Sequence, residues 1–417
     1  MIRAGAVALA ALLGLHHMSP AAAAARREPN ATLDGVAQEV AAHACSAIAG
    51  RFDAIAGNAP VLLRSYDGAK GSGEIDAPAL RTAAFTYDNA LAVIALLACE
   101  RRIEALRIGS ALEHAAMHDT RLRNAYRAGA VGDEVLPNGW WDAAQNRWVE
   151  DAYQAGTATG NVAWTALALH ALHDATADAR WRDAAVKLAI WVVENTRSPG
   201  ADGGFSGGVD GFDTAPVKFG WKSTEHAIDL MALFTRLADA DAAGDWREQA
   251  VHARRFLKHQ WDGDSGHFLI GTLPDGHTPN RATSALDVQW WSQLLPDAPL
   301  YWRRAIRYAE HNHAVGAGFD FNDDRDGEWL EGTAQAALAY RVVGETAAAQ
   351  RCLTEVAAQF SASGYVFATR EPRITTGLAI GPASTSADFY YYRRPHLGAT
   401  AWAALAALDR NPYLVRR

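Results

Sequence analysis

Apolar residues follow two alternating patterns along the chain, and both have the period of an α-helix. Six segments are apolar on nearly every side, as in helices that other protein surrounds; they cover residues 88–99, 160–172, 228–237, 285–295, 332–340 and 398–408. Six amphipathic segments alternate with them, at residues 33–54, 103–114, 179–194, 246–260, 301–311 and 345–360. Because each enclosed helix follows a half-buried one, we predict an all-α (α/α)6 barrel of six inner and six outer helices.

The spacing of the apolar segments indicates a repeat. Their starts lie roughly 45 to 75 residues apart, which fits helix hairpins with insertions between them. Strand signals are local, because Gly, Asp and Pro turn residues flank short apolar runs at residues 203–213, 266–278 and 364–377. We therefore expect short β-hairpins in the loops. No Pro-, Gly- or Ser-rich linker divides the chain, so residues 26–417 are expected to form a single domain.

Composition narrows the choice of partner. The 417 residues are 49% apolar and 21% charged, which is typical of a globular protein with a large core. A formal net charge of -8 leaves no basic stripe for a nucleic acid backbone, so we expect no nucleic acid partner. The 14 Trp and 12 Tyr residues are a high aromatic load. Most of them are expected to pack the core, but their flat faces and polar edges also suit sugar rings.

The first residues have the pattern of a secretory signal peptide. Arg3 precedes an apolar segment at residues 4–15, and small residues follow at 21–25. We therefore predict a signal peptide over residues 1–25 and an exported protein, periplasmic or secreted. The apolar segment is too short to span a bilayer, and no later window is long and apolar enough, so the mature chain is expected to have no membrane span. An uncleaved N-terminal anchor is the alternative.

Cysteine usage and the absence of known motifs argue against cofactor chemistry. Cys45, Cys99 and Cys352 are too few for a disulfide scaffold; one bridge is possible, and buried free thiols are equally compatible. No CxxC or HExxH spacing indicates a zinc site. No GxGxxG fingerprint joins a strand to a helix, which argues against nucleotide binding. We expect neither a cofactor nor a metal ion.

Polar and aromatic residues gather where each apolar helix begins. Acids in a first helical turn are common as caps, worth about 0.3 to 1 kcal/mol each, so no single one indicates catalysis. Capping does not require the amides, imidazoles and aromatic rings beside them. We therefore predict a polar, aromatic and acidic cup that binds a neutral oligosaccharide; its candidate residues are Tyr87, Asp88, Asp151, Trp221, Glu225, His226, Asp287, Gln289, Trp290, Trp329, Glu331, Tyr391 and His396.

This arrangement resembles the (α/α)6 toroids of the six-hairpin glycosidase superfamily. The resemblance covers essentially the whole mature chain and rests on periodicity and loop chemistry. It implies a glycan cleft at the end of the barrel where loops lead into the inner helices, with carboxylates from several of these helices acting together. Polysaccharide lyases, sugar epimerases and terpenoid cyclases use related toroids, so the fold does not by itself settle the reaction.

Hydrolysis of a glycosidic bond needs one carboxyl group to protonate the leaving oxygen and another to activate water or attack carbon. We choose Glu225 as the acid, because Trp221 and His226 beside it offer an apolar wall and a hydrogen-bond partner. The positive end of the helix dipole opposes this choice, since it lowers a carboxyl pKa. Asp287 is the preferred partner of Glu225, followed by Asp88 and Glu331.

Two other functions remain open. Tyr391, Arg393 and His396 form the kind of group that removes a proton beside a uronate carboxylate, which would fit a polysaccharide lyase or a sugar epimerase. A non-catalytic glycan-binding protein of the cell envelope is the second alternative. Acids at several separate helix starts favour chemistry over binding alone, and the predicted function is an exported glycoside hydrolase.

A short acidic loop, NDDRDG at residues 322–327, repeats the early spacing of a calcium-binding loop. Asn322, Asp324 and Asp326 occupy the first ligand positions, but the late bidentate glutamate is replaced by Thr333. The pattern therefore favours a solvated acidic turn.

Overall fold

The computed structural model describes residues 34–55, 57–67, 78–132, 139–240 and 244–414. Leu33–Arg417 forms one compact unit. The predicted signal peptide, residues 1–25, lies outside the described residues. Within the described residues, every helix is too short or too polar to cross a bilayer.

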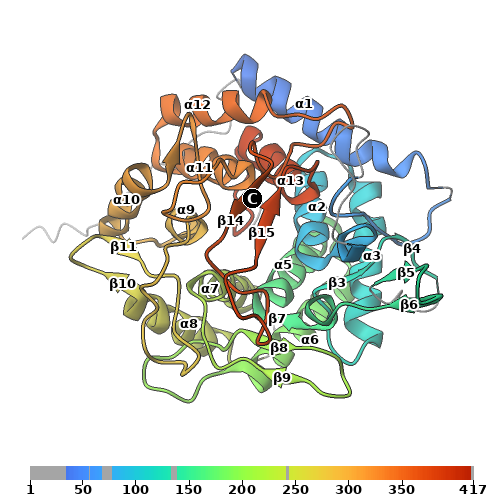
Figure 1. Cartoon of the computed structure of the whole chain (residues 1–417), viewed down its shortest axis with the longest axis horizontal. Coiled ribbons are helices and arrows are strands. Elements are labelled where there is room, and N and C mark those ends of the chain that lie inside the picture. The colour runs from blue at the N-terminus through green and yellow to red at the C-terminus, as the bar shows by residue number, and fades with distance from the viewer. Residues whose placement is uncertain (1–33, 56, 68–77, 133–138, 241–243, 415–417) are drawn as a thin grey trace, which may run out of the picture. The chain divides into compact units, whose positions relative to one another are not determined.

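Six helices form a closed inner ring. Each one packs against the next along the chain, and the last packs back against the first (Figure 1). In chain order they are α2 (Thr86–Ala98), α5 (Thr159–Thr176), α7 (Thr224–Asp239), α9 (Asp287–Leu294), α11 (Leu330–Val343) and α13 (Leu397–Ala407). Every residue of α9 and of α13 is buried, as the uniformly apolar pattern requires.

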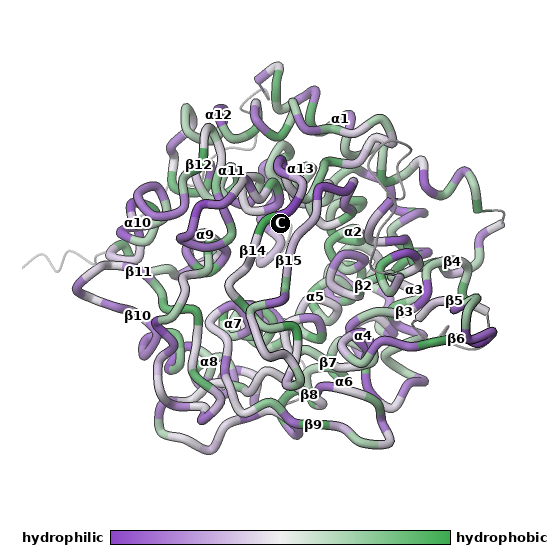
Figure 2. The backbone as a smooth tube through the Cα atoms, in the orientation of Figure 1, coloured by the Kyte–Doolittle hydropathy of each residue, from purple (hydrophilic) through white to green (hydrophobic). Residues whose placement is uncertain are grey.

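Six outer helices surround this ring. They are α1 (Gly35–Ala49), α3 (Arg102–His118), α6 (Ala179–Thr196), α8 (Trp246–Gln260), α10 (Arg304–Asn312) and α12 (Thr346–Ala357). In α8, Ala253, Phe256 and Leu257 are buried while charged residues face outward, and Figure 2 shows hydrophilic stretches along the outer helices. The predicted all-α (α/α)6 barrel is confirmed.

Most helices begin or end a few residues away from the predicted segments, and two differences lie around the fourth inner helix. The fourth inner helix begins at Asp287 rather than at residue 285. The next outer segment, predicted at residues 301–311, starts with a 3-10 turn, Leu300–Arg303, and continues as α10. A short extra helix, α4 (Ala152–Ala155), and two further 3-10 turns, Gly50–Phe52 and Pro78–Leu80, lie in the connections.

Strands are confined to small antiparallel sheets in the loops. One has three strands in the order β7 (Thr157–Ala158), β8 (Gly208–Asp210) and β9 (Val217–Lys218). The two-stranded sheets pair β1 (Val61–Leu62) with β4 (Gly129–Ala130), β2 (Ala83–Phe85) with β3 (Ala125–Arg127), β5 (Trp140–Asp142) with β6 (Arg147–Val149), β10 (Trp261–Asp262) with β11 (His267–Phe268), β12 (Ala314–Val315) with β13 (Gly318–Phe319), and β14 (Arg373–Thr375) with β15 (Tyr390–Tyr392).

The three predicted hairpin segments each contain a strand, but its partner lies outside the segment. The strand in residues 203–213 pairs with β7 and β9, and the strand in residues 266–278 pairs with β10. The strand in residues 364–377 is β14, whose partner β15 follows fifteen residues after Thr375. These pairings matter for the site, because the β14–β15 hairpin crosses the middle of the ring in Figure 1.

A disulfide joins the first outer helix to the first inner helix. Cys45 in α1 is bonded to Cys99, the residue after α2. Cys352 in α12 is a buried free thiol. The three cysteines are thus divided into one bridge and one thiol.

Candidate active site

The candidate site contains four acids, each from the first turn of a different inner helix. Asp88 lies in the first turn of α2, Glu225 in that of α7, Asp287 in that of α9 and Glu331 in that of α11. These four helix starts lie together at one end of the ring. The pKa of Tyr391 indicates this convergence, because, in addition to burial, the charges of Glu331, Glu225 and Asp287 all raise it.

Glu331 and Asp88 are joined through His396, which precedes α13. The Nε2 atom of His396 lies 3.2 Å from Asp88 Oδ2, and its Nδ1 atom lies 3.5 Å from Glu331 Oε2. Burial alone would lower the pKa of His396, but the carboxylates of Asp88 and Glu331 raise it above its ordinary value. In the neutral form, Nδ1 accepts the backbone N–H of Ala399 at 3.3 Å and caps α13.

A tyrosine and an amide complete the surroundings of Glu331. The hydroxyl of Tyr87 donates to Glu331 Oε1 at 2.7 Å, and Gln335 Nε2 lies 3.4 Å from the same oxygen. The indole N–H of Trp402 donates in turn to the Tyr87 hydroxyl at 2.9 Å. Burial nevertheless raises the pKa of Glu331 to about 7, because these bonds only partly offset desolvation.

Gly398 allows the acids to approach one another. A Cβ atom at this position would lie 2.6 Å from Asp88 Oδ1, 2.9 Å from His396 Cε1 and 3.1 Å from Glu331 Oε2. A side chain of any size would therefore displace the network. Above it, the ring of Tyr66 stacks on the imidazole of His396 with centroids 4.5 Å apart.

Glu225 and Asp287 are electrostatically coupled. Part of the Glu225 side chain is accessible, yet protein atoms surround its carboxyl group closely enough that burial, and then the charge of Asp287, raise its pKa well above the ordinary value. Burial raises the pKa of Asp287 to about 7, although the backbone N–H of Val288 donates to its Oδ1 atom at 2.6 Å. At this helix start, desolvation therefore outweighs the helix dipole, which would lower both values.

A fifth carboxyl group, Asp229, lies one turn after Glu225 in α7. It is fully buried, and the hydroxyl of Tyr413 donates to its Oδ1 atom at 2.7 Å. Burial raises its pKa well above the ordinary value, against the effect of this hydrogen bond. The apolar pattern of α7 concealed this acid, although its spacing of four residues from Glu225 was a usable signal.

Aromatic rings pack beneath the acids. The indoles of Trp164, Trp291 and Trp402 lie with centroids 5.3 to 5.7 Å apart. Tyr87 contacts Trp164 edge-on at 5.6 Å, and Tyr413 lies 5.4 Å from Trp164. Of these residues only Tyr87 was among the predicted site residues. The others were missed because each lies within an apolar helix or near the C-terminus, where core packing is the ordinary role of an aromatic residue.

The β14–β15 hairpin brings further aromatic residues to this end of the ring. Tyr391 in β15 is partly exposed and stacks on Trp329 with centroids 5.5 Å apart. Phe389, just before β15, lies 6.2 Å from Tyr153. Trp329 itself is buried, so it supports Tyr391 rather than presenting its own face.

On the α7 side, Trp221 and His226 lie with ring centroids 5.8 Å apart. Burial lowers the pKa of His226 to about 4, so the imidazole is neutral, and its Nδ1 atom has no hydrogen-bond partner among the described residues. Gly160 makes room for this ring, since a Cβ there would lie 2.5 Å from His226 Cδ2.

The structure places two predicted binding residues, Gln289 and Trp290, in buried positions. Gln289 is fully buried, and its side-chain amide forms hydrogen bonds with the backbone of Phe268. These bonds hold β11 against α9. Trp290 points to the outer side, against Phe319 and Tyr340, and its neighbour Trp291 takes the inner position. Both side chains are enclosed by protein in this structure, and their contact with substrate stays a prediction.

Asp151, the remaining predicted residue, caps α4. Its Oδ1 atom accepts the backbone N–H of Gln154 at 2.9 Å, and the side chain is partly exposed. This acid lies on the same side as Tyr153, whose pKa it raises together with burial and Glu225. Capping is its observed structural role.

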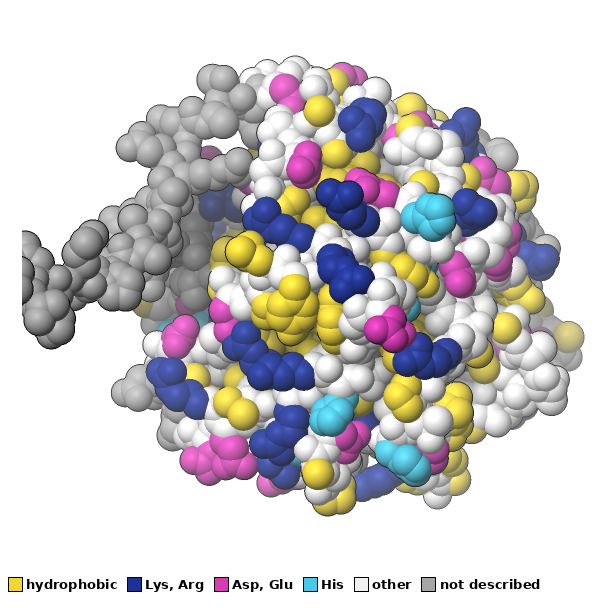
Figure 3. Space-filling view, turned by 90° about the vertical axis from the view of Figure 1, so that its left-hand side faces the viewer, with side chains coloured by type: hydrophobic (Ala, Val, Ile, Leu, Met, Phe, Trp, Pro, Cys, Tyr) yellow, Lys and Arg dark blue, Asp and Glu magenta, His cyan; other side chains and the backbone are white. Residues whose placement is uncertain are grey.

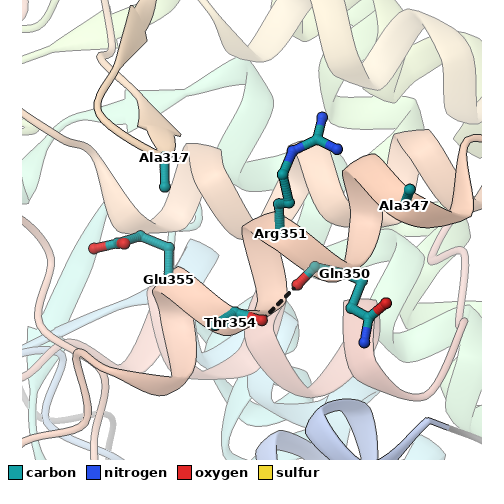
Figure 4. A pocket seen from close by; sticks show the side chains of 6 residues that line it. All are labelled: Ala317, Ala347, Gln350, Arg351, Thr354 and Glu355. Atoms are coloured by element: carbon teal, nitrogen blue, oxygen red, sulfur yellow. Dashed lines mark hydrogen bonds between the residues drawn. The ribbon is translucent and has the colours of Figure 1, made fainter.

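Other surface features lie away from this cluster. A pocket on the outer helix α12 is lined by Ala317 and by residues that project from that helix, among them Arg351 and Glu355 (Figure 4). On the side that carries α10 and β10, basic side chains are interspersed with acidic and apolar ones (Figure 3). Among the described residues, the acids that come close enough together to hold a metal ion are Asp320, Asp324 and Asp326.

Comparisons with known proteins bear on the fold. No protein-family profile and no curated protein sequence matches the chain. Among solved structures, a glycosidase variant in complex with glucose is similar over 91% of this chain and 99% of its own, at a TM-score of 0.61 and 12% identity. A sugar epimerase from a ruminal bacterium matches over 89% and 98%, at a TM-score of 0.59 and 11% identity.

An α-amylase from Clostridium perfringens is also similar, over 78% of this chain and 87% of its own, at a TM-score of 0.52 and 9% identity. The chain has the (α/α)6 toroid fold. The resemblance inferred from the repeat is thus confirmed for the architecture. Because identities this low carry the fold alone, the reaction has to be argued from the acids and aromatic residues of the toroid.

Proposed function

We propose that this toroid is a glycoside hydrolase that acts on a polysaccharide or oligosaccharide. The observation that carries the proposal is the convergence of Asp88, Glu225, Asp287 and Glu331 from four inner helices beside partly exposed tyrosines. Carboxyl groups of raised pKa are what acid and base catalysis at neutral pH requires. The similar toroids of a glycosidase and an α-amylase agree with it.

Glu225 acts as the general acid. Burial, and then the neighbouring acids Asp287 and Asp229, raise its pKa, which favours the protonated form that donates to the leaving oxygen. Asp287, with a pKa of about 7, is partly ionised under the same conditions and serves as base or nucleophile. The two residues lie on α7 and α9, which pack directly against each other.

Asp88, Glu331 and His396 are buried, and their hydrogen-bonded network holds the acids of the site in place. Tyr391 and Trp221 are partly exposed and offer ring faces on which a sugar can stack. These rings support a carbohydrate substrate.

The test is a product analysis with one matched pair of variants. Purified protein is incubated with a panel of polysaccharides, and the products are measured as new reducing ends, by mass and by ultraviolet absorbance. Hydrolysis yields reducing ends without an absorbing unsaturated product. Glu225→Gln should lower turnover by more than about a hundredfold.

The control is Glu248→Gln, the same change on the solvent side of α8, where the side chain is 65% exposed. It should leave turnover unchanged. Near-normal turnover of a folded Glu225→Gln variant would show that Glu225 is not the general acid. No product from any glycan with the wild-type protein would contradict the proposed hydrolysis.

Epimerisation of a free sugar is the second candidate, and two imidazoles favour it. His226 is neutral and its Nδ1 atom is unpartnered among the described residues, whereas the acids beside His396 favour the protonated form. One could remove a proton next to a carbonyl and the other return it. Incubation of sugars in D2O distinguishes the two reactions, because an epimerase inserts deuterium at carbon without cleavage. Absence of deuterium excludes this candidate.

We also propose that the protein is exported, to the periplasm or beyond. The signal-peptide pattern of residues 1–25 carries this proposal. The Cys45–Cys99 disulfide supports it, because such bonds persist in oxidising compartments.

A further inference from the structure

We propose a calcium site formed by Asp320, Asp324 and Asp326, in the loop between β13 and α11. One carboxylate oxygen of each residue lies within 4.8 Å of those of the other two. Oxygen ligands lie about 2.3 to 2.6 Å from a Ca²⁺ ion, so a group of this size suits the ion. All the donors are hard oxygen atoms, which suit calcium and not zinc or copper.

Asp320 supplies the observation that distinguishes this group from an ordinary acidic turn. The residue is fully buried, and its Oδ1 atom accepts the backbone N–H of Phe321 at 2.7 Å. Its Oδ2 atom has no hydrogen-bond partner among the described residues, and one of its two carboxylate oxygens lies within 4.8 Å of those of the other two acids. A buried, unpaired carboxylate oxygen is costly, and a bound cation removes that cost.

No basic side chain neutralises the group. Among the described residues, Asp320, Asp324 and Asp326 form no ion pair with Lys, Arg or His, although Arg370 of the next loop pairs with Glu355 at 3.4 Å. Three clustered carboxylates without a counter-ion repel one another. A divalent cation is the partner of suitable charge and size.

The sequence motif missed the decisive ligand. Residues 322–327 match only the start of a calcium-binding loop, because the late glutamate of that motif is absent. Asp320 precedes that segment by two residues and enters the group through the fold, since β13 ends just before it.

The position of the site indicates what the ion does. The hydroxyl of Thr375 donates to Asp324 at 2.6 Å, and its backbone N–H donates to Asp326 at 2.9 Å. Thr375 ends β14, whose partner strand β15 carries Tyr391 to the acid cluster. Bound calcium therefore holds the β14–β15 hairpin against the loop before α11 and keeps Tyr391 of β15 in position beside the active-site acids.

Calcium binding to the full chain, after treatment with a chelator, tests the site. Calorimetric titration with Ca²⁺ should give one saturable site, and the melting temperature should rise with Ca²⁺ and much less with Mg²⁺. Hydrogen exchange should slow at residues 320–326 and 373–392 when Ca²⁺ is added. Absence of binding, or protection confined to other segments, would overturn the proposal.

Variants locate the ion. Asp320→Asn keeps the shape of the side chain and should abolish binding, whereas Asp326→Asn, on an exposed residue, should weaken it at least tenfold without disturbing the core. Asp323→Asn is the matched control, because Asp323 is exposed, adjacent in sequence and outside the group. If Asp320→Asn does not fold, the comparison of Asp326→Asn with Asp323→Asn decides, and equal affinity in that pair would refute the site.

Discussion

Gly398 is the residue on which the acid network depends most directly. Three atoms of Asp88, His396 and Glu331 occupy the space that a side chain would need. Helix propensity favours alanine over glycine by about 1 kcal/mol in α13, so crowding alone accounts for any loss in an alanine variant. Glycine is therefore required at position 398 by the neighbouring acids and imidazole, and not by the helix.

Gly398→Ala should therefore lower turnover at least tenfold while the protein stays folded. The new Cβ atom, 2.6 Å from Asp88 Oδ1, pushes the carboxylates and His396 apart. The measurement is kcat/KM on whichever glycan is cleaved, together with the melting temperature. Gly35→Ala is the control, since nothing lies within 4 Å of a Cβ at that helical position. Equal activity of the two variants would contradict the assigned network.

The buried acids also predict how stability depends on pH. Asp287 has an ordinary pKa near 3.9 when unfolded and about 7 when folded, so between these values the folded state binds more protons than the unfolded state. The contribution of Asp287 to stability is therefore greatest at the acid end of this window and falls as pH rises from about 4 to 7. Glu331 acts in the same direction, because its folded pKa is also raised to about 7.

Asp287→Asn should raise the melting temperature at pH 8 and flatten its dependence on pH between 5 and 8. The amide has no charge to desolvate, and the gain is expected to be about 2 °C or more. Asp264→Asn, at an exposed aspartate, should change neither quantity. A melting temperature for Asp287→Asn below that of the wild type at pH 8 would show that Asp287 is not destabilised by burial.

At the scale of helices and strands, apolar periodicity was sufficient to predict the inner and outer helices. It did not predict how each inner helix is rotated about its own axis. A helix that is apolar on every side gives no signal for which face points inward, so Trp290 and Trp291 could not be told apart. Strand partners were missed for a related reason: a two-residue strand such as β11 is defined by its contacts, and its sequence carries little preference.

The Cys45–Cys99 disulfide is the element-scale feature with the clearest prediction. It ties α1 to the end of α2, across 54 residues of chain. Replacing both cysteines with serine should lower the free energy of unfolding by about 2 to 4 kcal/mol, because the unfolded chain gains entropy. Denaturant unfolding with and without a reducing agent measures the loss, and the double variant should no longer respond to the reductant. Cys352→Ala, which leaves the bridge intact, should still respond.

At the scale of the whole molecule, the site exists only when the ring closes. His396 and Asp88 are 308 residues apart in sequence, and Tyr87 and Glu331 are 244 apart. The candidate acids could be proposed from the sequence because each lies at the start of an apolar helix. Their shared environment could not, since it arises from the packing of α13 against α2.

Export is the last prediction, and it links the first residues of the chain to the disulfide. If residues 1–25 direct secretion, the protein recovered from the periplasm or medium of an expressing bacterium should begin near Arg26 and contain the Cys45–Cys99 bond. Leu12→Arg places a charge within the apolar segment and should retain the chain in the cytosol, with reduced cysteines. N-terminal sequencing and thiol titration of the two preparations make the comparison. A full-length wild-type chain in the membrane fraction would identify the segment as an anchor, and one in the cytosol would refute export.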